Sequence, residues 1–440
     1  MRRDPTLRTA ARACFDAAIA AVDPLRLVPR VLRRAGDTLR LEPHSGWPHT
    51  HRGPVLLVAA GKAALAMTDG ALATANPATG VVIVPHDVVA ARTPGIDVLG
   101  AAHPVPDAAG VAATRRLMAV VEAAGPDVLV LALLSGGASS LLVAPAGDLT
   151  LADTQAVTAA LLASGADIAA LNTVRKHCSR VKGGGLLRAA RGAAAIWTLA
   201  LSDVIGDDPA TIASGPTVAD PTTFADALAV VDRWLEPAAV PPRVRAHLEA
   251  GRAGRIVETL KDGDPALGRA VMRVLAGNRT AVTAAAAAAR GLGYEPYVPD
   301  EPLRGDAAEA GRAVAAHLAS LPRGRPVAYV TGGETTVRVV PGGRGGRSQQ
   351  LALAAALALV GRPGAILAAD TDGVDGPTDA AGACVDGETV TRARHRDLDP
   401  EVALAATNSH PLLDATGDLV RTGPTRTNVA DLVVALRPAC

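Results

Sequence analysis

The chain is poor in aromatic side chains and has almost no net charge. Phenylalanine, tryptophan and tyrosine make up 2% of its 440 residues, and the formal net charge is +1. So few aromatic side chains offer little surface on which nucleic-acid bases could stack, and a balanced charge does not attract polyanions. We therefore expect neither nucleic acid nor a membrane surface as a partner.

Cysteine is also scarce, and no long apolar run occurs. Cys14, Cys178, Cys384 and Cys440 are scattered, without a C-x-x-C pair or a Cys/His cluster. This argues against a disulfide framework or a zinc site and fits a reducing compartment. The first residues lack a signal-peptide core, and no apolar run of about 18 residues is present. We predict a cytoplasmic protein.

Continuous apolar runs followed by glycine recur through the first half of the chain. PVLLVAAGKAAL, VVIVP, DVLVLALLSGGASSLL and AAIWTLALSDVIGDDP are the main examples. Such runs between helical segments are typical of strands buried on both faces of a parallel sheet. We predict an α/β protein with a doubly wound domain over residues 1–240 and a smaller α/β domain over 265–440. The Pro- and Arg-rich stretch 241–264 is predicted to connect them. ETTVRVVPGGR is typical of a hairpin arm, so the second sheet should be mixed.

The loop within LALLSGGASSLL, residues 131–142, has features of a phosphate site. It reads Ser135, Gly136, Gly137, Ala138 and Ser139, and a helix is expected next. Glycines let the backbone approach a ligand, and free N–H groups at a helix start attract anions. The loop is neither a Walker A motif nor G-x-G-x-x-G. A plain strand-to-helix turn is the alternative.

A second glycine-rich segment lies in the other half of the chain. Arg344 and Arg347 stand among four glycines before a strongly apolar helix, and Gly333 and Glu334 end the preceding strand. Guanidinium groups in this position suit a phosphate or a carboxylate. A solvated basic hairpin is the alternative.

Acidic residues follow two predicted strands. Asp203 closes the strand in LALSDV, and Asp372 and Asp375 follow the strand in AILAADTDGVDG. Carboxylates at strand ends could hold Mg²⁺ or meet a substrate hydroxyl, although any one of them could instead cap a turn or helix.

Lysine is rare, which makes two lysines notable. Lys62 directly follows a strand and a glycine, and Lys176 stands beside Arg175 in LNTVRKHC. A lysine at a strand end can neutralise developing phosphoryl charge, whereas a surface lysine is the ordinary alternative.

Taken in chain order, these segments resemble the glycerate 2-kinase family, also called class II glycerate kinases, whose C-terminal domain is of the MOFRL type. The matching stretches include AAGKAALAM, AAHPVPD, LLSGGASSLL, LNTVRKHCSRVKGGGLL, LSDVIGDDPATIASGPT, GGETTV, GGRSQQLALA, TDGVDGPTDAAGA and TGPTRTNVADL. The resemblance covers nearly the whole chain. It implies a Rossmann-like N-terminal domain, a smaller C-terminal α/β domain and an active site in the interdomain cleft. It also implies transfer of the ATP γ-phosphoryl group to the 2-hydroxyl of D-glycerate, with Mg²⁺.

The resemblance also suggests roles for individual residues. The family's catalytic lysine and arginine fall on Lys62 and Arg347, and the acid of LSDV falls on Asp203. We expect the remaining roles as follows: nucleotide binding by Ser135, Gly136, Gly137, Ala138, Ser139, Lys176, Gly333 and Glu334; substrate binding by Arg175 and Asp375; Mg²⁺ binding by Asp203 and Asp372.

Four positions depart from the family pattern. Ala138 and Arg426 stand where glycine is expected, and Ser348 and Gln350 replace an amide and an acid. An additional arginine could select a larger or more anionic hydroxy acid. We expect a small hydroxy acid as the partner molecule, and a homodimer is compatible with the sequence.

Two other functions stay open at this point. One is an NAD(P)H-dependent hydroxypyruvate reductase, although no strand is followed by G-x-G-x-x-G with a ribose-binding acid. The other is a nucleotide-binding regulatory protein without turnover, which the replacements Ser348 and Gln350 keep open.

Overall fold

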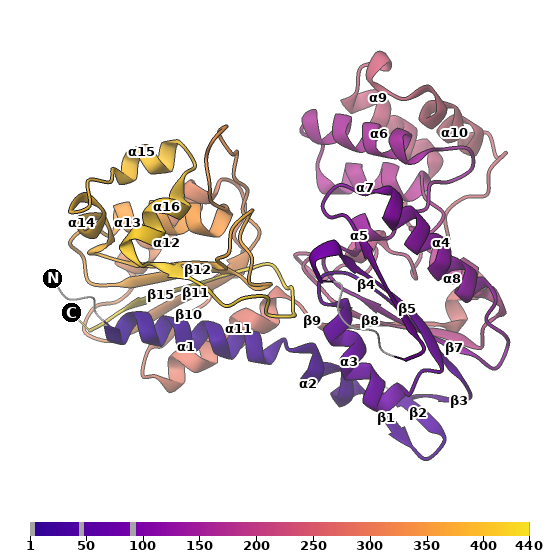
Figure 1. Cartoon of the computed structure of the whole chain (residues 1–440), viewed down its shortest axis with the longest axis horizontal. Helices are drawn as coiled ribbons and strands as arrows, with labels where there is room; N and C mark the ends of the chain where they lie inside the picture. The colour runs from indigo at the N-terminus through magenta and orange to yellow at the C-terminus, as the bar shows by residue number, and fades with distance from the viewer. Residues whose placement is uncertain (1–4, 44–47, 89–93, 440) are drawn as a thin grey trace. The chain divides into compact units, whose positions relative to one another are not determined.

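A computed structural model describes residues 5–43, 48–88 and 94–439 and divides the chain into two compact units (Figure 1). The parallel-sheet unit runs from Pro24 to Leu275. The mixed-sheet unit combines the chain up to Asp23 with residues from Ala276 onward. This division differs from the predicted boundaries at 240 and 265, and it assigns the first helix to the C-terminal unit.

The parallel-sheet unit is built on a six-stranded sheet with the order β6-β5-β4-β7-β8-β9. The pairs from β6 through β8 are parallel. The strands are β4 (Val55–Ala60), β5 (Thr79–Pro85), β6 (Ile96–Ala101), β7 (Leu129–Leu134), β8 (Ala195–Leu201) and β9 (Ala270–Ala276). The chain winds outward from β4 and then returns to lay β7 against it. This is the doubly wound order that the apolar runs predicted, and its switch point lies between β4 and β7.

Burial explains why these segments become strands. Every residue of β4 and of β7 is buried, as expected for strands covered on both faces. Helices α3 (Ala64–Ala75) and α4 (Ala108–Glu122) pack against this sheet. A small antiparallel sheet of β1 (Leu32–Ala35), β2 (Thr38–Leu41) and β3 (His49–Arg52) precedes it.

Four helices of the parallel-sheet unit form a layer with its own apolar core (Figure 1). They are α6 (Leu151–Ala163), α7 (Ile168–His177), α9 (Phe224–Trp234) and α10 (Pro242–Arg252). The expectation that 241–264 connects the domains is therefore wrong, because α10 buries Val244 and Leu248 in this core. Pro242 begins the helix instead of interrupting it, since a proline costs little at the first helical position.

The mixed-sheet unit contains a six-stranded sheet with the order β10-β11-β15-β12-β13-β14. Its strands are β10 (Glu295–Tyr297), β11 (Val327–Gly333), β12 (Ala365–Asp370), β13 (Gly382–Asp386), β14 (Leu419–Val420) and β15 (Asp431–Arg437). Only β10 and β11 pair in parallel; β15 runs antiparallel to both of its neighbours. The sheet is mixed as predicted, but for another reason. Residues 334–346 form no hairpin arm, and Thr336 makes only an isolated bridge to Asp306.

One strand lies in a different sheet from the one expected. The segment at 270–276 was predicted to belong to the second domain, yet it joins the parallel sheet as β9 beside β8. Six of its seven residues are only half-buried, as in an edge strand. Its local pattern specifies a strand and carries no information about which sheet accepts it.

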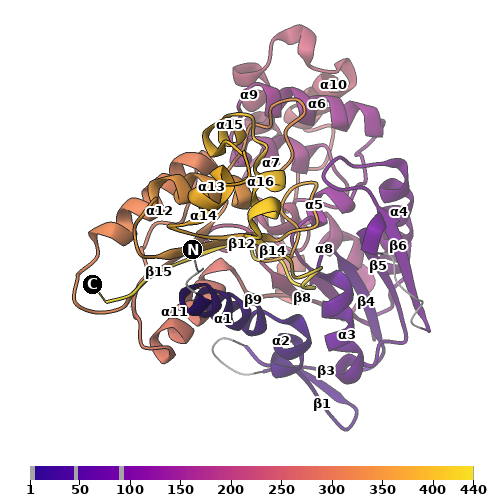
Figure 2. The ribbon, with the colours of Figure 1, turned by 60° about the vertical axis from the view of Figure 1, so that its left-hand side comes forward.

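Helices cover both faces of the mixed sheet (Figures 1 and 2). On one face lie α1 (Pro5–Ala21) and α11 (Asn278–Gly291), and on the other lie α12 (Ala307–Ser320) and α13 (Arg347–Ala358). Three short helices, α14 (Thr389–Arg394), α15 (Pro400–Ala405) and α16 (Ser409–Thr416), pack beside α13.

The first helix joins this unit through a regular apolar stripe. Ala11, Cys14, Phe15 and Ala18 are fully buried at spacings of three and four residues. They place α1 against α11, β12 and β15, which begin 257, 344 and 410 residues after the end of α1. Among the described residues, no helix is both long enough and apolar enough to cross a membrane.

The position of α1 gives a stability prediction. Phe15→Ala should lower the free energy of unfolding by about 3–5 kcal/mol, because it leaves a cavity under a fully buried ring. Hydrogen exchange should become faster in α11 and β15. Arg12→Ala is the control, since Arg12 makes only an exposed ion pair with Asp16. Faster exchange in β4 and β7 but not in α11 would contradict the assignment of α1.

Candidate active site

Two loops are joined at the carboxyl end of β4 and β7. The Lys62 N–H donates to the Gly136 carbonyl at 2.9 Å, and the Ala63 N–H donates to Ser135 Oγ at 3.0 Å. Gly61, with φ +127°, has no room for a side chain, because a Cβ there would lie 2.1 Å from Ser135 Oγ. The structure thus brings Lys62 directly against the Ser135–Ser139 loop, because β4 and β7 are neighbours in one sheet.

A glycine of this loop lets His103 and Lys62 approach its backbone closely. Gly137 has φ +83°, and a Cβ there would lie 3.1 Å from the His103 ring and 3.4 Å from Lys62 Cγ. Within the described part of the chain, the N–H groups of Gly136 and Gly137 donate to no acceptor. Two adjacent free amides beside a lysine and a histidine form a suitable anion site. His103 was not among the predicted site residues.

The next two residues of the loop point elsewhere. Ala138 is buried in the sheet core, so a methyl group is tolerated where the family pattern expects glycine. Ser139 Oγ lies 2.6 Å from Ser214 Oγ, which donates to Asn172 Oδ1 at 3.1 Å. Sequence reasoning missed Asn172 and Ser214. Ser214 is the second of three successive residues with φ between 53° and 62°. No local sequence pattern predicted this conformation.

Two basic side chains meet the backbone of the loop. Arg175 Nη2 and Lys182 Nζ donate to the Ser139 carbonyl at 3.0 and 2.6 Å, and Lys182 also donates to the Leu142 carbonyl at 3.0 Å. Burial lowers the pKa of Arg175 to about 10. Burial and the positive charge of Arg175 together hold the pKa of Lys182 well below its usual value. The loop therefore has the Arg175 guanidinium as a positive neighbour, although Arg175 was predicted to bind the substrate.

Asp203 lies at the same edge of the sheet. It follows β8, the parallel neighbour of β7, and is half-buried. Because parallel strands end on one side, Lys62, the loop after β7 and Asp203 share the carboxyl edge.

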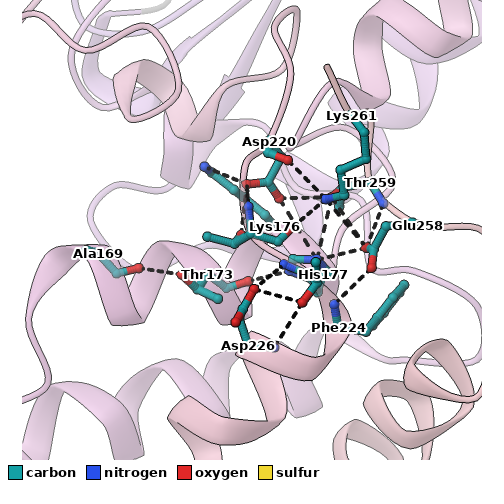
Figure 3. Close-up of polar contacts among 12 residues, drawn as sticks. Ala169, Thr173, Lys176, His177, Asp220, Phe224, Asp226, Glu258, Thr259 and Lys261 are labelled. Carbon is teal, nitrogen blue, oxygen red and sulfur yellow. Dashed lines mark hydrogen bonds and ion pairs between the residues drawn. The ribbon is translucent and has the colours of Figure 1, made fainter. Parts of the chain in front are cut away.

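Lys176 has a different place from the one expected (Figure 3). Its side chain is buried, and Nζ pairs with Asp220 Oδ1 at 3.2 Å. Burial raises the pKa of Asp220, but Lys176 and the hydrogen bond from Thr222 outweigh it and hold that pKa below its usual value. Successive residues of a helix point about 100° apart, so Arg175 faces the loop while Lys176 faces this network. A role in nucleotide binding is not supported by this arrangement.

The same network fixes the end of α7 (Figure 3). His177 Nε2 lies 3.0 Å from Glu258 Oε1, and Thr259 Oγ1 donates to Asp220 Oδ2 at 2.9 Å. These contacts tie α7 to the segments around 220 and 258, and so they hold Arg175 in position.

In the mixed-sheet unit, Arg347 is surrounded by acidic side chains. It approaches Asp431 at 2.8 Å, Asp370 at 3.2 Å and Glu334 at 2.7 Å. Burial lowers the pKa of Arg347, but the three carboxylates outweigh it and raise that pKa above its ordinary value. Burial also raises the pKa of Asp431, against the opposing effect of Arg347. Three carboxylates share one guanidinium, an excess of two negative charges when all are ionised.

The strand register explains this cluster. Asp431 lies opposite Gly333 on one side and opposite Asp370 on the other. Asp370 and Asp431 were not predicted as site residues. The sequence signal that could have identified them is an acidic residue beside a buried strand. A Cβ on Gly333 would lie 2.2 Å from the Leu303 carbonyl, so glycine is required there by packing. Nucleotide binding by Gly333 and Glu334 stays a prediction.

Asp375 caps a helix instead of facing a substrate. Its carboxylate accepts the N–H groups of Ser348 at 3.1 Å and Gln349 at 2.8 Å, and also Gln349 Nε2 at 2.9 Å. Burial raises the pKa of Asp375 to about 6, although these hydrogen bonds oppose the shift. Asp375 is 1% exposed and occupies the N-terminus of α13, where the glycine-rich segment at 342–347 was expected to bind an anion. We therefore no longer propose Asp375 as a substrate ligand.

The predicted Mg²⁺ pair is divided between the two units, with Asp203 in one and Asp372 in the other. Asp372 is buried, and its Oδ1 accepts the Val374 N–H at 2.9 Å. In the described residues, no three acidic, histidine or cysteine side chains are grouped as a metal site.

Arg426 occupies a conformation that favours glycine. Its φ is +68°, and its side chain is exposed. Only glycine adopts this region without steric cost, which explains why the family pattern expects glycine here.

Comparisons with known proteins identify the family. Residues 10–249 match a family described as "Domain of unknown function (DUF4147)", and residues 327–431 match the MOFRL family. A "Glycerate 2-kinase" of Pyrococcus horikoshii is 38% identical over 95% of this chain and 94% of its own length. The chain belongs to the glycerate kinase family. This confirms the resemblance seen in the sequence.

Two further relatives support the assignment. The crystal structure of a glycerate kinase from Thermotoga maritima matches with a TM-score of 0.82 and 34% identity, over 98% of this chain and 99% of that one. A protein of Agrobacterium vitis is 44% identical over 98% of this chain and 94% of its own length; its name, a hydroxypyruvate reductase, is only provisional. The glycerate kinase likeness also confirms the predicted fold of a parallel-sheet and a mixed-sheet unit.

The capping role of Asp375 can be tested by Asp375→Ala. We expect the free energy of unfolding to fall by about 1–3 kcal/mol, because buried N–H donors lose their acceptor. Asp379→Ala in the same loop is the control, since Asp379 makes surface contacts with Arg421. A variant of normal stability with a raised KM for the acceptor would instead restore Asp375 as a substrate ligand.

The conformation of Arg426 predicts a stabilising substitution. Arg426→Gly should raise the free energy of unfolding by about 1 kcal/mol, because it removes the steric cost of the left-handed backbone. Arg323→Gly, in an exposed loop with ordinary φ, should not stabilise the protein. If Arg426→Gly and Arg323→Gly changed the midpoint temperature of thermal unfolding equally, the explanation from the backbone conformation of Arg426 would be contradicted.

Proposed function

We propose that this glycerate kinase family member transfers the γ-phosphoryl group of ATP to the 2-hydroxyl of D-glycerate. One observation carries the proposal: Lys62 lies against the Gly136–Gly137 amides at the switch point of a doubly wound sheet. Ligands of open α/β sheets bind at such a point. Relatives named as glycerate 2-kinases, which align over most of the chain, support glycerate as the acceptor.

Each group has a defined task in this proposal. The Gly136 and Gly137 N–H groups bind phosphate oxygens, and Lys62 neutralises the charge that develops on the transferred group. Asp203 orients the acceptor hydroxyl or takes its proton. Arg347, held in a fixed position by three carboxylates, supplies a second positive group, as the family resemblance suggests.

The donor groups also fit a divalent cation. The three carboxylates around Arg347 carry an excess of negative charge, and carboxylate oxygens are the ligands that Mg²⁺ prefers. These three carboxylates already pair with the Arg347 guanidinium and form no metal-binding group within the described residues, so Asp203 and Asp372 stay the proposed ligands. Mg²⁺, when bound, would neutralise phosphate charge on ATP. A cytoplasmic location and a homodimer remain predictions.

Hydroxypyruvate reduction is the second candidate, and the name of the Agrobacterium vitis relative favours it. In this chain β4 is followed by Gly61-Lys62-Ala63 instead of the glycine fingerprint of dinucleotide-binding enzymes. ADP release with D-glycerate and oxidation of NAD(P)H with hydroxypyruvate distinguish the two activities directly.

Lys62→Met tests the proposed transfer. We expect kcat for ADP release with D-glycerate to fall by about 10²–10³, since a charge-stabilising group is lost, with little change in thermal stability. Arg115→Met, on an exposed position of α4, is the control. Near-normal turnover in a folded Lys62→Met protein would overturn the role of Lys62.

A further inference from the structure

An apolar cavity of about 330 Å³ lies in the parallel-sheet unit beside the Ser135–Ser139 loop. Its walls come from the segment after β6, from the short helix α5 (Ala138–Leu141), and from α6 and α7. Val105, Leu142, Val157 and Leu162 are among its apolar lining residues. Val105 and Leu162 are more than half exposed, so the cavity is open to solvent on that side.

One end of the cavity is positively charged. Ser139, Ser140, Arg175 and Lys182 all line it. In the described part of the chain, Arg175 and Lys182 donate only to backbone carbonyls, and neither has a carboxylate within ion-pair distance. Buried charges in proteins are normally paired. Lys176, the neighbour of Arg175 on α7, follows that rule with Asp220.

An unpaired guanidinium at the end of an apolar cavity, with the Lys182 amine beside it, indicates an organic anion as the ligand. The ligand needs an apolar body for the walls and negative charge for the Arg175–Lys182 end. Glycerate lacks the apolar body. Since Ser139 belongs both to the cavity and to the loop that carries the free Gly136 and Gly137 amides, one molecule could occupy both places.

We propose that this cavity binds the adenosine part of ATP, with the phosphate chain passing the Arg175–Lys182 end toward the Gly136–Gly137 amides. The proposal rests on the proposed kinase function. The cavity volume lies within the range of small-molecule sites. Gln155 Nε2 donates to the Pro106 carbonyl at 2.7 Å, which orients its amide and leaves the oxygen for a donor on the base.

This assignment changes the expected roles of two residues. Arg175, predicted to hold the substrate carboxylate, becomes a nucleotide ligand, and Lys182 takes the part first given to Lys176. The base is held by exposed aliphatic side chains such as Val105 and Leu162, in keeping with the scarcity of aromatic residues.

The first test fills the cavity. Ala159 lines it from an exposed position on α6, so Ala159→Trp places a ring inside without disturbing the core. Calorimetric titration should show ADP and adenosine binding weakened by about tenfold or more. Ala119→Trp is the control, because Ala119 is exposed on α4 and does not line the cavity. Unchanged ADP affinity in Ala159→Trp would overturn the proposal.

The second test separates the base from the phosphates. Arg175→Met should weaken ADP by about tenfold while changing adenosine affinity much less, because only the phosphates meet the guanidinium. The midpoint temperature of thermal unfolding of the ligand-free variant should not be lowered, because Lys182 still donates to the Ser139 carbonyl. Equal loss of ADP and adenosine binding, or no loss of either, would contradict the proposed orientation.

Failure of the cavity proposal can be told from failure of the kinase proposal. Glycerate phosphorylation by Ala159→Trp with an unchanged KM for ATP overturns the cavity and leaves the kinase intact. ADP binding that Ala159→Trp weakens, in a protein that does not phosphorylate glycerate, leaves the cavity and overturns the kinase. A wild-type protein that binds neither ADP nor adenosine overturns both.

Discussion

The hydrogen bonds between the loops after β4 and β7 are the constraint on which the candidate site depends. Lys62 and Ala63 donate to Gly136 and Ser135, so the lysine and the glycine-rich loop form one rigid unit. The contact exists because the doubly wound order places β4 and β7 side by side, with their carboxyl ends together. The carboxyl edge of the parallel sheet also positions the free amides, His103 and Asp203.

Helix α7 contributes a side chain to this edge of the sheet, and its two sides make different contacts. Arg175 faces the Ser139 carbonyl and the apolar cavity, whereas Lys176 and His177 are held by Asp220 and Glu258 (Figure 3). The basic side chains on one side of α7 are buried and paired with acidic residues. Among the described residues, the Arg175 guanidinium on the other side has no such partner. The proposed nucleotide site follows from that contrast.

The mixed-sheet unit shows how charge can mislead a sequence interpretation. The glycine-rich segment at 342–347 suggested an anion site, yet Asp375 already fills the N-terminus of α13, and three carboxylates surround Arg347. The local charge is negative, which suits a cation. Arg347 keeps its proposed role only as a guanidinium fixed by acidic neighbours.

The sequence by itself determined the fold class and the family, because apolar strands ending in glycine and the family's motifs are local patterns. Tertiary structure decided the rest. The first helix belongs to the C-terminal unit, and residues 270–276 form a strand of the parallel sheet. The segment 241–264 begins with a helix that packs in an apolar core. A local strand or helix pattern does not specify which other elements it packs against. Asp375, Lys176 and Ser214 likewise took roles set by residues distant in sequence, and only the folded chain brings those residues within hydrogen-bonding distance.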